Sequence, residues 1–147
     1  MKIAITKRAR SYRVALERDG RWSSADVGAK GWFPHDVVHF VVERQLGLEG
    51  FWAHRARGLS AMAIADLAKA GGHASAKRSR DVSSDVTELV QAERVVECFE
   101  AEVWGEPADN GTLRDITRAA CDQSGVPAPA LSDRDIATIR GGLRELA

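Results

Sequence analysis

Alternation of polar and apolar residues dominates the first part of the chain. Residues 2–7 and 12–18 each place apolar side chains at every second position, a period that is typical of a strand with one buried face. The pair Asp19-Gly20 follows the second segment, and glycine accepts the positive φ that a tight two-residue hairpin requires. We therefore predict an antiparallel three-strand meander, with residues 21–27 as its third strand.

One face of this meander must be covered for the sheet to be stable, because three short strands with an exposed apolar face do not persist in water. We expect the apolar residues of each strand to face inward, Trp22 among them. The segment that begins at Pro34 is the nearest candidate cover. Trp32 stands just before it and is placed to pack on Val37 as a hydrophobic staple.

Helical periodicity begins at residue 34. Pro34 is favoured at the first position of a helix, and Gly47 is a natural stop. A short helical turn is expected at 51–57, and longer helices are expected at 60–70, 85–104, 113–124 and 132–146. Polar residues able to cap these longer helices stand at their starts: Ser60, Asp85, Thr112 and Ser132.

The sequence therefore predicts an α+β fold, in which a small N-terminal antiparallel β-meander is followed by four or five helices. We expect a single domain over 1–147, with the meander in 1–31 and the helical part in 32–147. The chain has 147 residues, of which 44% are hydrophobic and 29% charged. This composition is ordinary for a folded protein and argues against global disorder.

The composition also bears on the compartment. The sequence contains no run of 18 apolar residues that would span a membrane, and its first residues alternate and turn basic at once, unlike a secretion signal. Cys98 and Cys121 belong to no Cys-x-x-Cys pair. We therefore expect a cytoplasmic protein with two reduced, buried thiols.

Charge is unevenly distributed, although 21 basic and 21 acidic side chains balance over the whole chain. Residues 1–57 carry 11 basic and 6 acidic side chains, whereas residues 83–110 carry 1 basic and 8 acidic side chains. Such asymmetry either steers a partner or draws the two segments together within the fold. We favour attraction within the fold, because it requires no partner.

A polar stripe along the helix predicted from Pro34 is the main chemical feature of the sequence. At about 100° per residue, His35, Asp36, His39 and Glu43 share one side of that helix. Imidazoles four residues apart lie one turn apart, about 6 Å along the axis, and can close on one metal ion. The stripe therefore predicts a divalent-metal site, with Zn²⁺ as the ion.

The segment His35-Asp36-Val37-Val38-His39 resembles the His-Glu-x-x-His motif of zinc peptidases, with Asp in place of Glu. The resemblance covers five residues. It implies that His35 and His39 hold zinc and that Asp36 is the general base that deprotonates a water molecule on the metal. Asp is one methylene shorter than Glu, so its reach toward that water is reduced.

A wider string, Pro-His-Asp-x-x-His-x-x-Val-Glu at residues 34–43, resembles small uncharacterised bacterial proteins that carry this helix after a β-hairpin. The likeness covers about the first third of the chain and implies no particular activity. Glu43 lies about 12 Å along the helix from His35, too far to share one ion easily. We therefore expect Glu43 to accept the distal N–H of His39, and keep it as a second candidate base.

A third metal ligand must come from another segment, and several acids or imidazoles qualify. We select Asp66, because the periodicity places it beside apolar residues of its helix. His54 is a second option. Glu93, Glu97 and Glu100 form a third, since they are spaced i, i+4 and i+7 on the long predicted helix. A di-iron bundle would need two carboxylate-x-x-His repeats, and only one is present.

Two classes of function remain open at this point. The first is a metal-dependent hydrolase with Zn²⁺ on His35 and His39 and with Asp36 or Glu43 as the base. The second is a non-enzymatic interaction or nucleic-acid-binding module, in which the polar stripe is only a solvated face. The sequence names no partner and leaves oligomerisation open.

Several basic side chains could contact phosphates in the nucleic-acid version of the second class. They are Arg8, Arg10, Arg13, Lys77, Arg78 and Arg80. The balanced charge of the whole chain disfavours nucleic acid. An adaptor that docks through its acidic helix is a further form of the interaction hypothesis.

Overall fold

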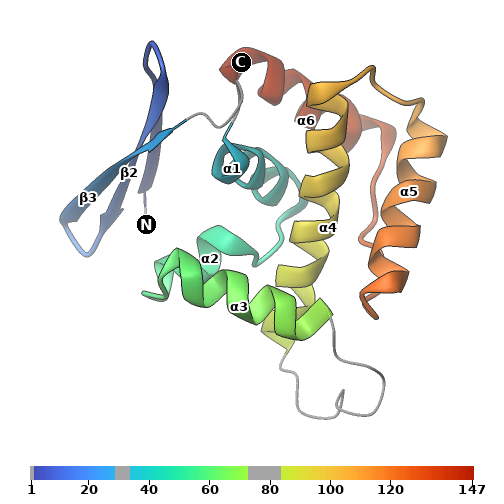
Figure 1. Cartoon of the computed structure of the whole chain (residues 1–147), viewed down its shortest axis with the longest axis horizontal. Coiled ribbons are helices and arrows are strands. Elements are labelled where there is room, and N and C mark those ends of the chain that lie inside the picture. Colours follow the sequence, from blue (N-terminus) through green and yellow to red (C-terminus); the bar gives the residue numbers. More distant parts are fainter. Residues whose placement is uncertain (1, 29–33, 73–83) are drawn as a thin grey trace.

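The computed structural model describes residues 2–28, 34–72 and 84–147. Its described part contains a three-stranded antiparallel sheet followed by six helices, so the predicted α+β fold is confirmed (Figure 1). The short turn expected at 51–57 is the sixth helix. In chain order the elements are β1 (Lys2–Lys7), β2 (Ser11–Arg18), β3 (Arg21–Gly28), α1 (His35–Leu46), α2 (Phe51–Ala56), α3 (Ala61–Gly72), α4 (Ser84–Trp104), α5 (Asn110–Gln123) and α6 (Asp133–Leu146).

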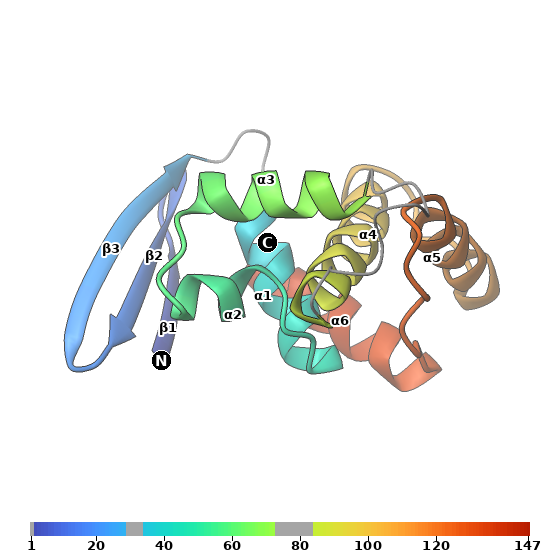
Figure 2. The same ribbon diagram turned by 90° about the horizontal axis from the view of Figure 1, so that it is seen from below.

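Helix α1 occupies the middle of the molecule, between the sheet at one end and α4 (Figure 1). It packs against α4, α6 and α2, and α5 packs on the far side of α4. Figure 2 shows α2 and α3 side by side, with α3 extending from the sheet toward α4. Two segments distant in sequence, α1 and α4, are therefore neighbours at the centre of the fold.

The turn between β2 and β3 has the conformation that its sequence predicts. Asp19 and Gly20 have φ of 52° and 75°, as a two-residue hairpin of the mirror-image type requires. This turn pairs Glu17 with Trp22, so Trp22 lies on the face opposite to the buried Tyr12 and is 60% exposed. The prediction that Trp22 is buried is wrong, because the register of a hairpin decides which face a side chain joins.

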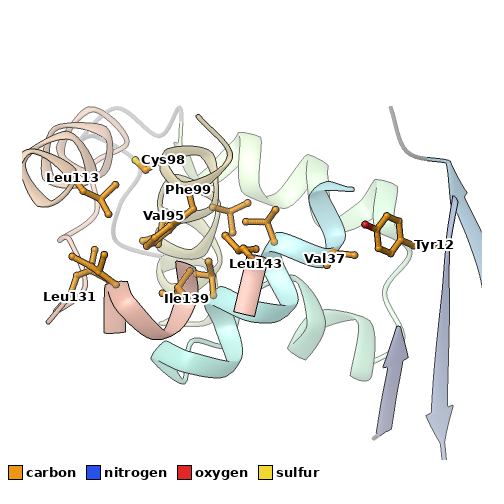
Figure 3. Close-up of a cluster of buried hydrophobic side chains, with 13 residues drawn as sticks. Tyr12, Val37, Val95, Cys98, Phe99, Leu113, Leu131, Ile139 and Leu143 are labelled. Carbon is orange, nitrogen blue, oxygen red and sulfur yellow. The ribbon is translucent and has the colours of Figure 1, made fainter. Parts of the chain in front are cut away.

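The sheet is joined to the helices through its inner face. Tyr12 is buried and its hydroxyl donates a hydrogen bond to the carbonyl of Leu146 (2.9 Å). Tyr12 also belongs to the main hydrophobic cluster, together with Val37 of α1 (Figure 3). The rest of that cluster comes from α1, α4, α5, α6 and the segment before α6, so these elements share one core.

Capping chemistry explains several helix ends. Pro34 precedes the first residue of α1, and Gly47 ends the helix with φ of 68°, a left-handed conformation that suits glycine. Ser132 caps α6, as predicted, and the structure adds a reciprocal capping box with Asp135. Helix α5 starts earlier than expected: Asp109, not Thr112, is the cap, and it accepts the Thr112 backbone N–H (3.0 Å).

Two of the sequence predictions fall on other parts of the chain. Trp32, the expected staple residue, lies outside the described residues, and so do Lys77, Arg78 and Arg80. Within the described ranges, no helix has the length and apolar character needed to cross a membrane.

Candidate metal centre

Two histidines of α1 and one glutamate of α4 converge where these helices pack. The Nε2 atoms of His35 and His39 lie 3.0 Å apart. One carboxylate oxygen of Glu93 lies 3.5 Å from His35 Nε2, and the other lies 3.5 Å from His39 Nε2. These three residues form a group whose potential ligand atoms all lie within 4.8 Å of one another. His35 and His39 face α4 together because they are one helical turn apart.

The spacing of these atoms suits a transition-metal ion. Zinc binds imidazole nitrogen and carboxylate oxygen at about 2.0–2.2 Å, so two ligand atoms of a tetrahedral site lie about 3.3 Å apart. The two Nε2 atoms are 3.0 Å apart, and each lies 3.5 Å from its nearer Glu93 oxygen, which is close to that value. The two 3.5 Å distances end on different oxygens, so the Glu93 carboxylate would have to rotate for one oxygen to bind an ion held by both imidazoles.

Glu43 fixes the orientation of His39 through Nδ1, the ring nitrogen that does not face His35 and Glu93. One Glu43 oxygen lies 2.8 Å from His39 Nδ1. Since an ionised carboxylate only accepts hydrogen bonds, Nδ1 carries the hydrogen and donates it. In the neutral ring this leaves the Nε2 lone pair pointing at His35 and Glu93. Both residues are buried, with His39 fully inaccessible.

The start of α2 holds Glu43 in place. Its two oxygens accept the backbone N–H groups of Phe51 (2.7 Å) and Trp52 (3.0 Å), which have no partner within their own helix. Gly50 makes this approach possible. A Cβ atom at Gly50 would lie 2.5 Å from Glu43 Oε1 and 2.7 Å from the Cβ of Ala92, so a side chain there would displace the carboxylate.

His35 has an equivalent carboxylate partner on α4. Its Nδ1 donates to Glu100 Oε1 at 3.0 Å, while its Nε2 points to His39 and Glu93. Both imidazoles are therefore oriented by a carboxylate on Nδ1, an arrangement typical of metal-binding histidines. The two rings differ in exposure, because 44% of the His35 side chain is accessible and none of the His39 side chain is.

The charges in this cluster are unequal, with three carboxylates around two imidazoles. Hydrogen bonds to Glu100 and Glu93 raise the pKa of His35 to about 10. Burial alone would lower the pKa of His39, but Glu43 and Glu93 outweigh it and raise that pKa. Burial would raise the pKa of Glu93, yet its two histidine partners hold it below the usual range. Protons on the imidazoles therefore compensate the acids when no metal is bound.

The structure does not bring Asp66 to this cluster. The buried residues of α3 are Ile64 and Ala68, whereas Asp66 is exposed. Asp66 is two residues from each of them, which is about 200° around the helix, so it points away from α4. Met62, one helical turn before Asp66, is 75% exposed although it is apolar, so the apolar side chains of α3 do not mark its buried face.

Two other residues that the sequence predicted for the site, Asp36 and His54, are not part of the cluster. Asp36 follows His35 on α1, and its carbonyl accepts the indole N–H of Trp52 (3.1 Å). No contact between described residues joins its carboxylate to the cluster. His54 is buried and donates from Nδ1 to the carbonyl of Gly50 (2.8 Å), so it stands apart from the three converging groups.

Glu93 was one member of the acidic series that the sequence offered, and its neighbours have other partners. Glu97 lies 2.7 Å from Arg94 and is exposed, and Glu100 binds the distal nitrogen of His35. The signal for this series was the helical spacing of acids in the acidic segment of the chain. That signal does not distinguish Glu93 from Glu97, since only the packing of α1 on α4 selects between them.

No protein-family model matches the chain, and neither the curated proteins nor the solved structures searched contain a match. The resemblances of residues 34–43 therefore remain expectations. The geometry of the cluster is the basis for assigning a function.

Proposed function

We propose that the protein binds one Zn²⁺ ion through His35, His39 and Glu93 and uses it as a hydrolytic centre. One observation carries this proposal: His35 and His39 of α1 and Glu93 of α4 each offer a potential ligand atom, and these atoms all lie within 4.8 Å of one another. Each imidazole is held from behind by a carboxylate, Glu100 or Glu43. A merely solvated polar face would not need one of its histidines fully buried.

The ligand set also favours catalysis over a structural role. Structural zinc sites are closed by four protein ligands, whereas two histidines and one glutamate are the ligands of several zinc hydrolases, with the fourth position left for water or substrate. Bound zinc polarises a carbonyl or phosphoryl oxygen and lowers the pKa of a bound water molecule. His35, His39 and Glu93 would hold the ion.

Of the two candidate bases, Glu43 has less support from the structure. Its two oxygens accept three N–H groups, from His39, Phe51 and Trp52, and the side chain is buried. A carboxylate so engaged orients His39 and is not free to contact a water molecule on the metal. Asp36, the residue that the zinc-peptidase resemblance implies, remains the candidate base.

A zinc titration of metal-free protein tests the metal site directly. We expect the ring signals of His35 and His39 in the NMR spectrum to shift until one equivalent is added. His54 serves as an internal control, because its Nδ1 is bonded to a backbone carbonyl and its ring lies outside the cluster. If the His35 and His39 signals do not respond at stoichiometric zinc, the proposal fails.

Hydrolysis is tested separately with a panel of activated esters, peptides and phosphoesters. Asp36→Asn should retain the zinc and lose turnover, since the amide cannot take up a proton. Loss of metal from this variant would show that Asp36 supports the site and is not its base. Equal turnover in the wild type and the variant would contradict the assignment of Asp36.

The nucleic-acid hypothesis gains no support from the described arginines. Arg13 forms two hydrogen bonds with Asp26 (3.0 and 2.9 Å), and Arg8 approaches the same carboxylate at 3.9 Å. These pairs neutralise part of the basic surface of the sheet. The metal site is therefore the better-supported proposal.

A further inference from the structure

The three converging residues differ in their access to solvent. His39 is fully inaccessible, 16% of the Glu93 side chain is exposed, and 44% of the His35 side chain is exposed. Exposure thus increases from the His39 side of the cluster to the His35 side. Of the three residues, His35 is therefore the most accessible to a ligand that arrives from solvent.

The described residues supply three potential ligands at this place. Within the part of the chain that the structure describes, the group of potential ligands consists of His35, His39 and Glu93. Glu43 and Glu100 are engaged at the distal nitrogens of the imidazoles and are not available for the ion. A tetrahedral ion bound there would retain one position without a protein ligand.

The charges around that position select among possible ligands. Glu93, Glu43 and Glu100 each contribute one negative charge at hydrogen-bonding or ion-pairing distance from an imidazole. With two neutral imidazoles and one divalent ion, the centre has a net charge of about −1. An anionic ligand would be repelled, whereas a neutral donor would not.

We infer that the fourth position of this centre is open to solvent beside His35 and takes a neutral donor ligand, such as water or an amide carbonyl, in preference to an anion. This inference rests on the proposed function, because it requires a metal ion on His35, His39 and Glu93. It implies that the natural substrate presents an uncharged group to the metal.

Cobalt(II) provides the test, because its visible absorption bands report each change of ligand. Protein loaded with Co²⁺ is titrated with imidazole, a neutral donor at about pH 8, and separately with azide, an anion. We expect imidazole to change the bands. Bands that respond to neither probe would overturn the open position.

The variant Glu100→Gln tests the effect of charge. The amide oxygen introduced by this substitution can still accept from His35 Nδ1 but carries no charge, so azide affinity, measured on cobalt-saturated protein, should rise about 10-fold relative to imidazole affinity. Glu106→Gln, which removes an exposed charge after the end of α4, is the matched control and should change neither. Unaltered azide affinity in Glu100→Gln would refute the preference for neutral ligands.

Failure of the proposed function itself has a different signature. Without a metal site, stoichiometric Co²⁺ would produce no protein-dependent visible bands, which would overturn the proposed function and this inference together. Bands that form but do not change with either probe would support the metal site and contradict only the open fourth position.

Discussion

Helix α4 contributes acids to two polar clusters that differ in how well they are balanced. Near its C-terminal end, Glu102 forms two hydrogen bonds with Arg140 (2.6 and 2.8 Å). Arg140 also donates to Asn110 and to the carbonyl of Ala108. Little of either charged side chain is exposed, and one cation meets one anion.

The cluster around Glu93, farther toward the N-terminal end of α4, has no such balance. Three carboxylates surround two imidazoles, and the two Nε2 atoms face each other at 3.0 Å. Two neutral rings in this position would leave a lone pair opposed to a lone pair or share a single hydrogen. Thus the Glu102 cluster is complete without a ligand, whereas the Glu93 cluster requires protons or a metal cation.

Removal of one imidazole should have the largest effect on the difference between the two clusters, because it removes a potential metal ligand. His35→Ala should weaken zinc binding by more than about 100-fold, because a two-ligand site binds the ion poorly. The side chain is substantially exposed, so the fold should survive, which circular dichroism can verify. Competition with a chromophoric chelator measures the affinity, and retention of wild-type affinity would refute the ligand set.

Glu43→Gln should have a smaller effect on zinc affinity, about 10-fold to 100-fold, because partners of metal-binding histidines tune the ligand rather than bind the ion. The amide would still accept from His39 Nδ1, but without the negative charge. The same chelator competition measures the change. A loss as large as that in His35→Ala would indicate that Glu43 binds the metal itself.

Zinc affinity should rise with pH over about pH 6–8, by about 10-fold per unit for each proton displaced. The pKa of His35 is raised to about 10, so the ring is protonated throughout this range and must release its proton to bind metal. Calorimetry in two buffers of different ionisation enthalpy should detect at least one proton released per zinc. No release would contradict the raised pKa.

The same pKa governs the stability of the metal-free protein. The pKa of His35 is higher in the folded state than its ordinary value of 6.5, so the folded state binds more protons. Its stabilising contribution should be fully present below about pH 6.5 and be lost as the pH rises toward about 10. Urea unfolding at several pH values, with His35→Ala as the comparison, isolates this contribution.

Arg140→Met should leave zinc affinity unchanged and act on stability alone. The substitution leaves Glu102 with little exposure and no cation, at a cost of about 2 kcal/mol in the free energy of unfolding. Chemical denaturation and the chelator assay on the same variant measure both quantities. A loss of zinc binding in a folded Arg140→Met protein would mean that the two clusters are coupled.

Local chemistry made much of the fold predictable. The alternation of residues 2–7, the Asp19-Gly20 turn and the caps at Ser60 and Ser132 are all read from neighbours in the sequence. Each depends on contacts within a few residues, which tertiary packing does not change. The same holds for the juxtaposition of His35 and His39, since the helical repeat alone places them together.

Two predictions were wrong for different reasons. The inward assignment of Trp22 overlooked a local constraint: a two-residue turn at Asp19-Gly20 pairs Glu17 with Trp22, which places Trp22 on the face opposite to Tyr12. The choice of Asp66 failed to predict the cluster because α3 buries its Ile64 and Ala68 side, and an alanine-rich helix offers little contrast between its faces.

The sequence by itself determined that one helix carries two imidazoles on one face, with Glu43 one turn beyond, and that an acidic segment lies elsewhere in the chain. Only the tertiary structure decided that α1 packs on α4, that Glu93 faces both rings and that Glu100 lies behind His35. The physical reason is the distance along the sequence over which each effect acts. Helical periodicity acts over a few residues, whereas a third ligand more than fifty residues away is selected by how two hydrophobic faces meet.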